Sequence, residues 1–132
     1  MNAATFPDVE QARFNMVEQQ IRPWDVLDQN VLELLFKVKR EDFVPPSMRS
    51  LAFVDTEIPL RFDDYDSGEC MLAPKVEARL LQELALKPSD SVLEIGTGSG
   101  YHTALLASMA QTVTSVEILP RLASFAQANL KR

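Results

Sequence analysis

One stretch of the sequence, residues 91–101 (Ser-Val-Leu-Glu-Ile-Gly-Thr-Gly-Ser-Gly-Tyr), constrains the fold more than any other. Its first half is a short apolar run with the length and branching of a buried parallel strand. Three glycines at alternate positions follow, and residues 101–107 have the pattern of a helix. This order lets a ligand lie against bare backbone at the carboxyl end of the strand. The stretch therefore predicts an α/β fold with a cofactor site at the glycine loop.

The residues around the glycines indicate which cofactor the loop binds. The next β-rich run, residues 113–116, ends on Glu117. This acid follows Gly96 by about 20 residues, where nucleotide-binding α/β units carry a carboxylate for ribose hydroxyls. Glu94 adds negative charge beside the loop, which repels a pyrophosphate but suits a ligand with an ammonium and a sulfonium. Tyr101 stands where a dinucleotide fingerprint has a small residue.

This pattern favours S-adenosylmethionine over NAD or FAD. The residues expected to bind it are Glu94, Gly96, Thr97, Gly98, Gly100 and Glu117. A nucleotide-dependent oxidoreductase is an alternative, which Tyr101 and Glu94 argue against. A glycine turn without any ligand is a further alternative, but three alternating glycines cost backbone entropy that an ordinary turn avoids.

Composition and charge narrow the class of protein. The 132 residues are 46% hydrophobic and 24% charged, which is typical of about one globular domain. No run approaches the ~18 consecutive apolar residues of a membrane span. The net charge of −6 comes without a basic stripe, so we expect neither nucleic acid nor a membrane as a partner.

Cysteine and histidine usage bears on metal binding and on the cellular compartment. Cys70 is the only cysteine and His102 the only histidine, so a Cys/His zinc cluster and an intrachain disulfide are excluded. We therefore expect no metal site. The single cysteine and the lack of a recognisable secretory signal fit a reducing cytoplasm.

Local patterns predict the remaining elements. In order, they are a loose tail over 1–8, a helix over 9–21, a helix capped by Asn30, a solvated turn over 39–42, an edge strand or arm over 52–60, an acidic loop over 61–69, and helices opened by Pro74 and Pro120. The acidic loop lacks the glycine and the closing glutamate of a calcium site, so we expect it to be solvated.

The predicted architecture is unusual in its second half. It contains only two parallel strands, and these are too few for an independent doubly wound sheet. We therefore expect either the N-terminal portion of a longer enzyme or a chain that completes its sheet by association, with self-association through an exposed sheet edge. The predicted division is residues 1–73, a helical section and a covering arm, and residues 74–132, the first part of the cofactor-binding domain.

From Phe14 onward the chain resembles the N-terminal half or more of protein-L-isoaspartate O-methyltransferases. Matching blocks stand in family order at family-like spacing over residues 16–21, 31–32, 40–45, 52–55, 92–101, 105–107 and 116–117. The resemblance implies a class I methyltransferase (Rossmann-like) fold with an N-terminal addition that covers the active site. It also implies methyl transfer from S-adenosylmethionine to isoaspartyl carboxyls of damaged proteins, which starts their repair, and therefore a protein or peptide substrate.

The resemblance also assigns roles to residues of the loop. It implies that Gly96, Thr97 and Gly98 lie along the cofactor, that Glu117 holds the ribose hydroxyls, and that Glu94 lies under the methionine end.

One segment departs from the family pattern. The family carries Gly-x-Thr-Ile-Ser-x-Pro, and the serine hydroxyl lies at the reacting centre. Gly68 and Pro74 frame the segment here, but Cys70 stands at the threonine position and Leu72 at the serine position. Leucine can neither donate nor accept a hydrogen bond, so we assign no catalytic residue and expect altered or lost specificity. The alternative is a non-catalytic methyltransferase-like binding module. Cys70 is expected to be a small buried thiol.

Overall fold

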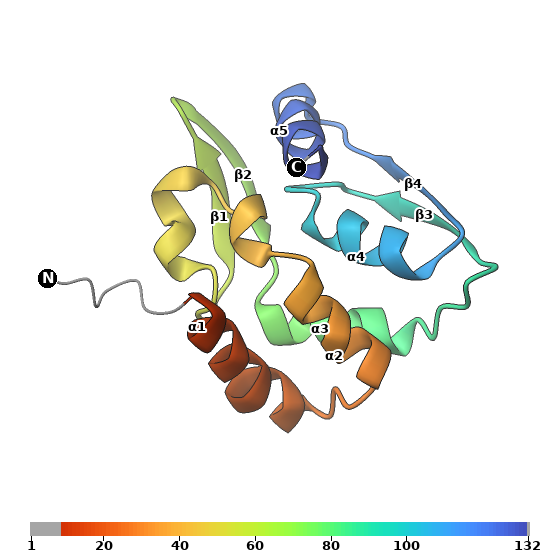
Figure 1. Cartoon of the computed structure of the whole chain (residues 1–132). Coiled ribbons are helices and arrows are strands. Elements are labelled where there is room, and N and C mark those ends of the chain that lie inside the picture. Colours follow the sequence, from red (N-terminus) through yellow and green to blue (C-terminus); the bar gives the residue numbers. More distant parts are fainter. Residues whose placement is uncertain (1–8, 132) are drawn as a thin grey trace, which may run out of the picture.

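The computed structural model describes residues 9–131, and Figure 1 shows their arrangement. The first part of the chain is helical. In order, it contains α1 (Val9–Met16), a π-helical turn (Val17–Ile21), a 3-10 turn (Arg22–Trp24), α2 (Gln29–Lys37), and two further 3-10 turns (Arg40–Phe43 and Pro46–Leu51). The predicted loose tail over 1–8 lies outside the described residues.

The second part holds the strands. In order, they and their helices are β1 (Ile58–Phe62), β2 (Tyr65–Met71), α3 (Pro74–Glu83), β3 (Ser91–Ile95), α4 (Tyr101–Met109), β4 (Thr112–Val116) and α5 (Pro120–Leu130). β3 and β4 pair in parallel, with Ser91 opposite Thr112 and Ile95 opposite Val116. The predicted order of strand, helix, strand and helix is confirmed, and both helices predicted to open on proline do so.

The two faces of the β3–β4 pair differ in burial. On one face, Val92 and Val113 pack against the hydrophobic core. On the other face, the side chain of Leu93 is 64% exposed and that of Ile95 75% exposed. Because parallel strands are usually covered on both faces, this exposure is unusual. The described part of the chain therefore leaves one apolar face of this sheet open.

The predicted acidic loop over residues 61–69 is wrong, because most of it lies in an antiparallel hairpin of β1 and β2. The turn falls at Asp63, whose φ of 54° is left-handed. The Phe62 ring stacks on Phe125 of α5 with centroids 4.5 Å apart. The Arg121 guanidinium lies 4.6 Å from the centre of the Tyr65 ring. These contacts with α5 hold the hairpin in place although its sequence is rich in charge. The predicted strand or arm over 52–60 is shorter than expected and begins at Ile58.

The start of α2 also differs from the prediction. Asp28, not Asn30, caps the helix, because its carboxylate accepts hydrogen bonds from the N–H groups of Asn30 and Val31. Gln82 of α3 accepts from the N–H groups of Leu27 and Asp28, so the cap is tied to a second helix.

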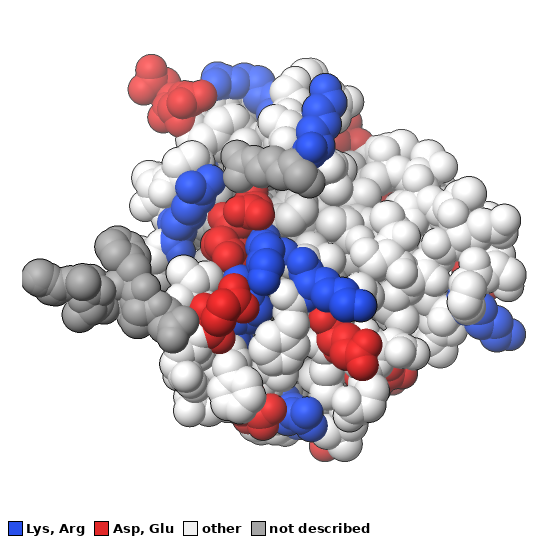
Figure 2. Space-filling model, in the orientation of Figure 1, with Lys and Arg blue, Asp and Glu red and all other residues white. Residues whose placement is uncertain are grey.

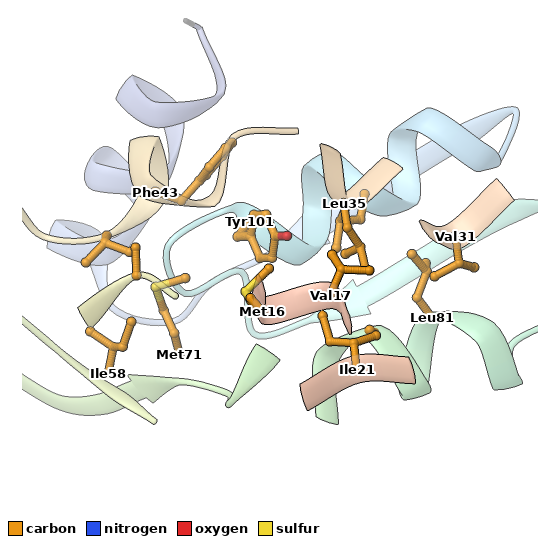
Figure 3. Packing of buried hydrophobic residues seen from close by; sticks show 14 of the residues in the cluster. Met16, Val17, Ile21, Val31, Leu35, Phe43, Ile58, Met71, Leu81 and Tyr101 are labelled. Carbon is orange, nitrogen blue, oxygen red and sulfur yellow. The ribbon is translucent and has the colours of Figure 1, made fainter. Parts of the chain in front are cut away.

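The hydrophobic core joins the helical section to the strands. Figure 3 shows side chains from α1, α2, α3, α4 and both hairpin strands meeting in one cluster, which includes Met16, Val17, Ile21, Val31, Leu35, Phe43, Ile58, Met71, Leu81 and Tyr101. Elements on both sides of the predicted boundary at residue 73 contribute to this cluster. The division into 1–73 and 74–132 stays a prediction.

The predicted solvated turn over 39–42 is wrong at Arg40, whose side chain is fully buried. Its guanidinium donates to the carbonyls of Ala52 (2.9 Å) and Leu72 (2.8 Å) and to the Glu77 carboxylate (3.1 Å). A buried charge is tolerated when it is paired and its donors find acceptors. Arg40 therefore ties three distant segments together.

A second buried arginine organises the N-terminal helix. Arg13 is fully buried and forms ion pairs with Glu41 (2.7 Å) and Glu10 (3.0 Å).

Figure 2 shows basic and acidic side chains side by side on the left of the molecule, while the right side is mostly uncharged. Among the described helices, none has the length and apolarity needed to cross a membrane.

We expect acid to destabilise the fold through the Arg13 network. Hydrogen bonding to Arg13 lowers the pKa of Glu10 from 4.5 to about 2. The unfolded chain takes up this proton at higher pH, so the contribution of Glu10 is present above pH 4.5 and is lost as the pH falls towards 2. Urea unfolding between these pH values should show a falling midpoint, and the Glu10→Gln variant should show a smaller fall. The control is Glu33→Gln, which removes an exposed carboxylate on α2. The same acid sensitivity in Glu10→Gln and the parent chain would contradict this account.

Candidate cofactor site

The glycine loop lies at the carboxyl ends of β3 and β4. The N–H groups of Gly96 and Thr97 both donate to the carbonyl of Val116, at 2.8 and 3.2 Å. The loop closes through a hydrogen bond from Gly100 N–H to the Thr97 carbonyl, and α4 begins at Tyr101. The backbone of the loop is therefore fixed to the end of the neighbouring strand, as expected for two parallel strands that end together.

The three glycines have different surroundings. All have positive φ: 97° at Gly96, 59° at Gly98 and 90° at Gly100. A Cβ at Gly96 would meet nothing within 4 Å, so the space above this residue is open. A Cβ at Gly100 would lie 3.2 Å from the Leu130 side chain and 3.3 Å from Ala126. Gly100 therefore allows α5 to approach closely, a reason for glycine that the sequence did not indicate.

The structure brings Glu117 to the loop. One carboxylate oxygen accepts a 2.8 Å hydrogen bond from Gly98 N–H, and the other accepts from Leu119 N–H at 3.1 Å. These contacts place a fixed carboxylate beside the middle glycine, and the ribose-binding role that the spacing indicates for Glu117 stays a prediction.

Glu94 borders the loop at the smaller hollow, within a hydroxyl network. One of its oxygens accepts from both Thr103 and Ser115, the latter at 2.6 Å. The Thr97 hydroxyl is hydrogen-bonded in turn to Ser115, also at 2.6 Å. Glu94 therefore links β3, β4, α4 and the loop, and we infer that it shapes the site as well as lining it.

Two hollows border the loop. The larger, about 420 Å³, is lined by Leu60, Glu69, Cys70, Ile95, Gly96, Gly98, Val116, Glu117, Ile118 and Leu122. The smaller, about 240 Å³, is lined by Cys70, Met71, Leu72, Glu77, Leu80, Glu94, Ile95, Gly96, Thr97, Gly98, Ser99 and His102. They share four residues, so together they follow the loop from Glu117 to His102. Their combined size falls within the roughly 300–1,000 Å³ of small-molecule sites. The described residues contain no cluster of His, Cys, Asp and Glu that could hold a metal ion.

The end of β2 forms one wall of the hollows, and its Cys70 lines both. Cys70 is exposed there, so its prediction as a buried thiol is wrong. Partial desolvation and the Glu57 and Glu69 carboxylates raise the pKa of this thiol, which keeps it protonated and weakly nucleophilic. Leu72, two residues after Cys70, borders the smaller hollow.

The structure also places residues at the site that the sequence did not identify. Glu77, in the first turn of α3, and His102, in the first turn of α4, both line the smaller hollow. His102 Nδ1 lies 3.6 Å from Glu77 Oε2, while the other Glu77 oxygen accepts from Arg40. A proline-opened helix with an acid in its first turn is an ordinary helix start, so no sequence signal marked Glu77.

We expect the glycines to respond differently to a methyl group. Both Gly96→Ala and Gly100→Ala are strained by positive φ, but only Gly100→Ala also forces a Cβ against α5. Gly100→Ala should therefore lower the free energy of unfolding by about 1–3 kcal/mol more than Gly96→Ala, the usual cost of overpacking. Urea unfolding of both variants measures this difference. Equal losses would show that the contact with α5 is not tight.

Comparison with known families identifies relatives over nearly the whole chain. The family model described as "Protein-L-isoaspartate(D-aspartate) O-methyltransferase" matches residues 11–132. A protein-L-isoaspartate O-methyltransferase of Aeropyrum pernix is 40% identical over 125 residues, which cover 92% of this chain and 46% of that protein. A protein-L-isoaspartate O-methyltransferase 2 of Marinobacter nauticus is also 40% identical and covers 95% of this chain and 55% of the relative. The chain thus spans about half the length of the curated relatives it matches.

Solved structures show the same fold. A protein from Plasmodium falciparum, described as a putative protein-L-isoaspartate O-methyltransferase in complex with S-adenosyl-L-homocysteine, aligns with a TM-score of 0.70 at 22% identity. The alignment covers 92% of this chain and 54% of that protein. A second protein-L-isoaspartate O-methyltransferase also gives a TM-score of 0.70, at 23% identity. The predicted α/β, Rossmann-like methyltransferase fold is confirmed.

Proposed function

Because the chain belongs to the protein-L-isoaspartate(D-aspartate) O-methyltransferase family, we propose that it binds S-adenosylmethionine at the glycine loop and takes part in methylating protein carboxyl groups. The observation that carries this proposal is the contact of Glu117 with Gly98 N–H at the edge of the larger hollow. It sets a carboxylate beside bare loop backbone, which is the arrangement that a ribose requires.

The two ends of the loop suggest how the cofactor lies. Glu117 stands at the larger hollow, where its oxygens suit the ribose hydroxyls, and Ile118 and Leu122 offer apolar surface for an adenine. Gly96 and Gly98 line both hollows and Thr97 lines the smaller one, while Glu94 also borders the smaller hollow, where it suits the methionine end. Gly100 contributes through the close approach of α5.

The charge of the site favours this cofactor over a dinucleotide. Glu69, Glu77, Glu94 and Glu117 border the two hollows, so an incoming pyrophosphate meets four carboxylates. A sulfonium and an ammonium are attracted by the same groups. The oxidoreductase alternative therefore has less support than the methyltransferase.

Methyl transfer depends on alignment more than on acid–base chemistry, because an acceptor carboxylate is already ionised near neutral pH. S-adenosylmethionine, when bound, supplies a methyl group on a positively charged sulfur. The chain has to hold the acceptor in line with that methyl and to exclude water. The smaller hollow, with Leu72 on its wall, is the place for the acceptor, and we propose that the acceptor is a protein or peptide.

The first experiment is calorimetric titration of the chain with S-adenosylhomocysteine. We expect binding that falls about 10- to 100-fold in Glu117→Gln, since a hydrogen bond to a charged group contributes about 1.5–3 kcal/mol. Glu33→Gln, which removes an exposed acid on α2, should bind like the parent chain. A chain that unfolds cooperatively and does not bind S-adenosylhomocysteine would contradict the proposal, and preferential binding of NADH would support the oxidoreductase.

The acceptor end requires a separate assay. We expect weak methyl transfer to an isoaspartyl peptide, and an increase in Leu72→Ser, because a hydroxyl on this wall can donate to a carboxylate. The measurement is radiolabel transfer from S-adenosylmethionine. Cofactor binding without transfer in either chain would favour the non-catalytic binding module.

We also propose that two copies associate at the β3–β4 sheet. It has two strands, so among the described residues its outer edges have no ladder partner, and Leu93 is exposed beside them. Sedimentation velocity should show a concentration-dependent dimer that is weakened in Leu93→Lys. A chain that stays monomeric at every concentration would contradict this part of the proposal.

A further inference from the structure

His102 is the one histidine of the chain, and its surroundings are unusual. Its side chain is 19% exposed and lies on the wall of the smaller hollow. Nδ1 is buried, has no hydrogen-bond partner among residues 9–131, and faces the Glu77 carboxylate at 3.6 Å. A buried ring nitrogen without a partner requires an explanation, because such groups are usually satisfied.

Glu77 is itself held in place. Its side chain is 7% exposed, and Arg40 donates to its Oε1 at 3.1 Å. Its second oxygen, Oε2, is the one that faces His102. A protonated imidazole would therefore complete a buried row in which a carboxylate lies between two cations. A protonated imidazole carries a hydrogen on both ring nitrogens, so when its Nδ1–H is directed at Glu77 its Nε2–H remains as a donor for a ligand.

The charges around the smaller hollow bear on which ligand this donor would bind. Among the described residues that line it, Glu77 and Glu94 carry negative charge, and His102 alone can carry positive charge. An acceptor carboxylate that enters this hollow meets repulsion from the two glutamates. The side chains of Leu72 and Leu80, which also line the hollow, offer it no hydrogen bond.

We propose that His102, held by Glu77, binds the carboxylate of the methyl acceptor; this inference rests on the proposed function. Nε2–H donates to one oxygen of the acceptor carboxylate, which turns the other oxygen towards the methyl group. A bond forms between that oxygen and the methyl carbon, the carbon–sulfur bond breaks, and its electron pair stays on the sulfur, which becomes neutral. No proton is transferred, so His102 acts as a binding and orienting group, not as a base.

Because the chain has one histidine, NMR observes this imidazole without ambiguity. The chain, labelled with ¹⁵N-histidine and saturated with S-adenosylhomocysteine, is titrated with an isoaspartyl peptide and with the methyl ester of the same peptide. We expect the acid to shift the imidazole nitrogen signals saturably and the ester, which lacks the anion, to shift them far less. If the acid peptide binds while these signals stay unchanged, or does not bind to the loaded chain, the inference is wrong. Failure of S-adenosylhomocysteine to bind would instead count against the proposed function.

A variant pair separates ligand binding from a structural role. We expect His102→Gln to weaken binding of the acid peptide about 10- to 100-fold, as for a lost hydrogen bond to a charged group. Its melting temperature and its affinity for S-adenosylhomocysteine should change little. The control is Ser108→Ala on the same helix, where the hydroxyl donates to the Ala104 carbonyl within the helix. A parallel loss of stability and of affinity for both ligands in His102→Gln would show that the histidine is structural.

Discussion

The geometry of the site depends on one buried guanidinium. Arg40 donates to Ala52 before the hairpin, to Leu72 at the exit of the hairpin and to Glu77 in α3, and Tyr101 of α4 packs its ring 5.0 Å away. A buried cation requires this full set of partners, since each unmet hydrogen bond would cost free energy. A single side chain therefore fixes the wall of the smaller hollow relative to the helix that follows the glycine loop.

The same contact explains why this loop differs from a dinucleotide fingerprint. Tyr101 occupies the position where such loops have a small residue for close packing of helix and strand. Here its ring is 2% exposed, packs against Arg40 and Phe43, and burial raises the pKa of its hydroxyl to about 12. The close approach occurs one residue earlier, between Gly100 and Ala126 of α5. The departure from the pattern thus reflects a different packing partner, not a damaged loop.

Features set by local sequence were predictable, and those set by distant contacts were not. The helix start at Pro120 and the meeting of Glu117 with the loop follow from local chemistry and from two parallel strands ending together. The hairpin depends on Phe62 stacking against Phe125. The burial of Arg40 depends on its contact with the Glu77 carboxylate, 37 residues away in the sequence. A run of charged residues has the same sequence pattern whether its side chains are solvated or paired in the core. His102 was noted only as the single histidine, since its place beside Glu77 depends on how α3 and α4 pack.

The proposed site raises the question of how one carboxylate can both shape a loop and hold a ligand. Glu117 already accepts from Gly98 and Leu119 N–H groups, one on each oxygen. An ionised carboxylate offers about four acceptor positions, so both oxygens can accept a further hydroxyl. Ligand binding then does not break the contacts that fix the loop. Because those contacts are formed before a ligand arrives, the binding free energy is not reduced by the cost of ordering the loop.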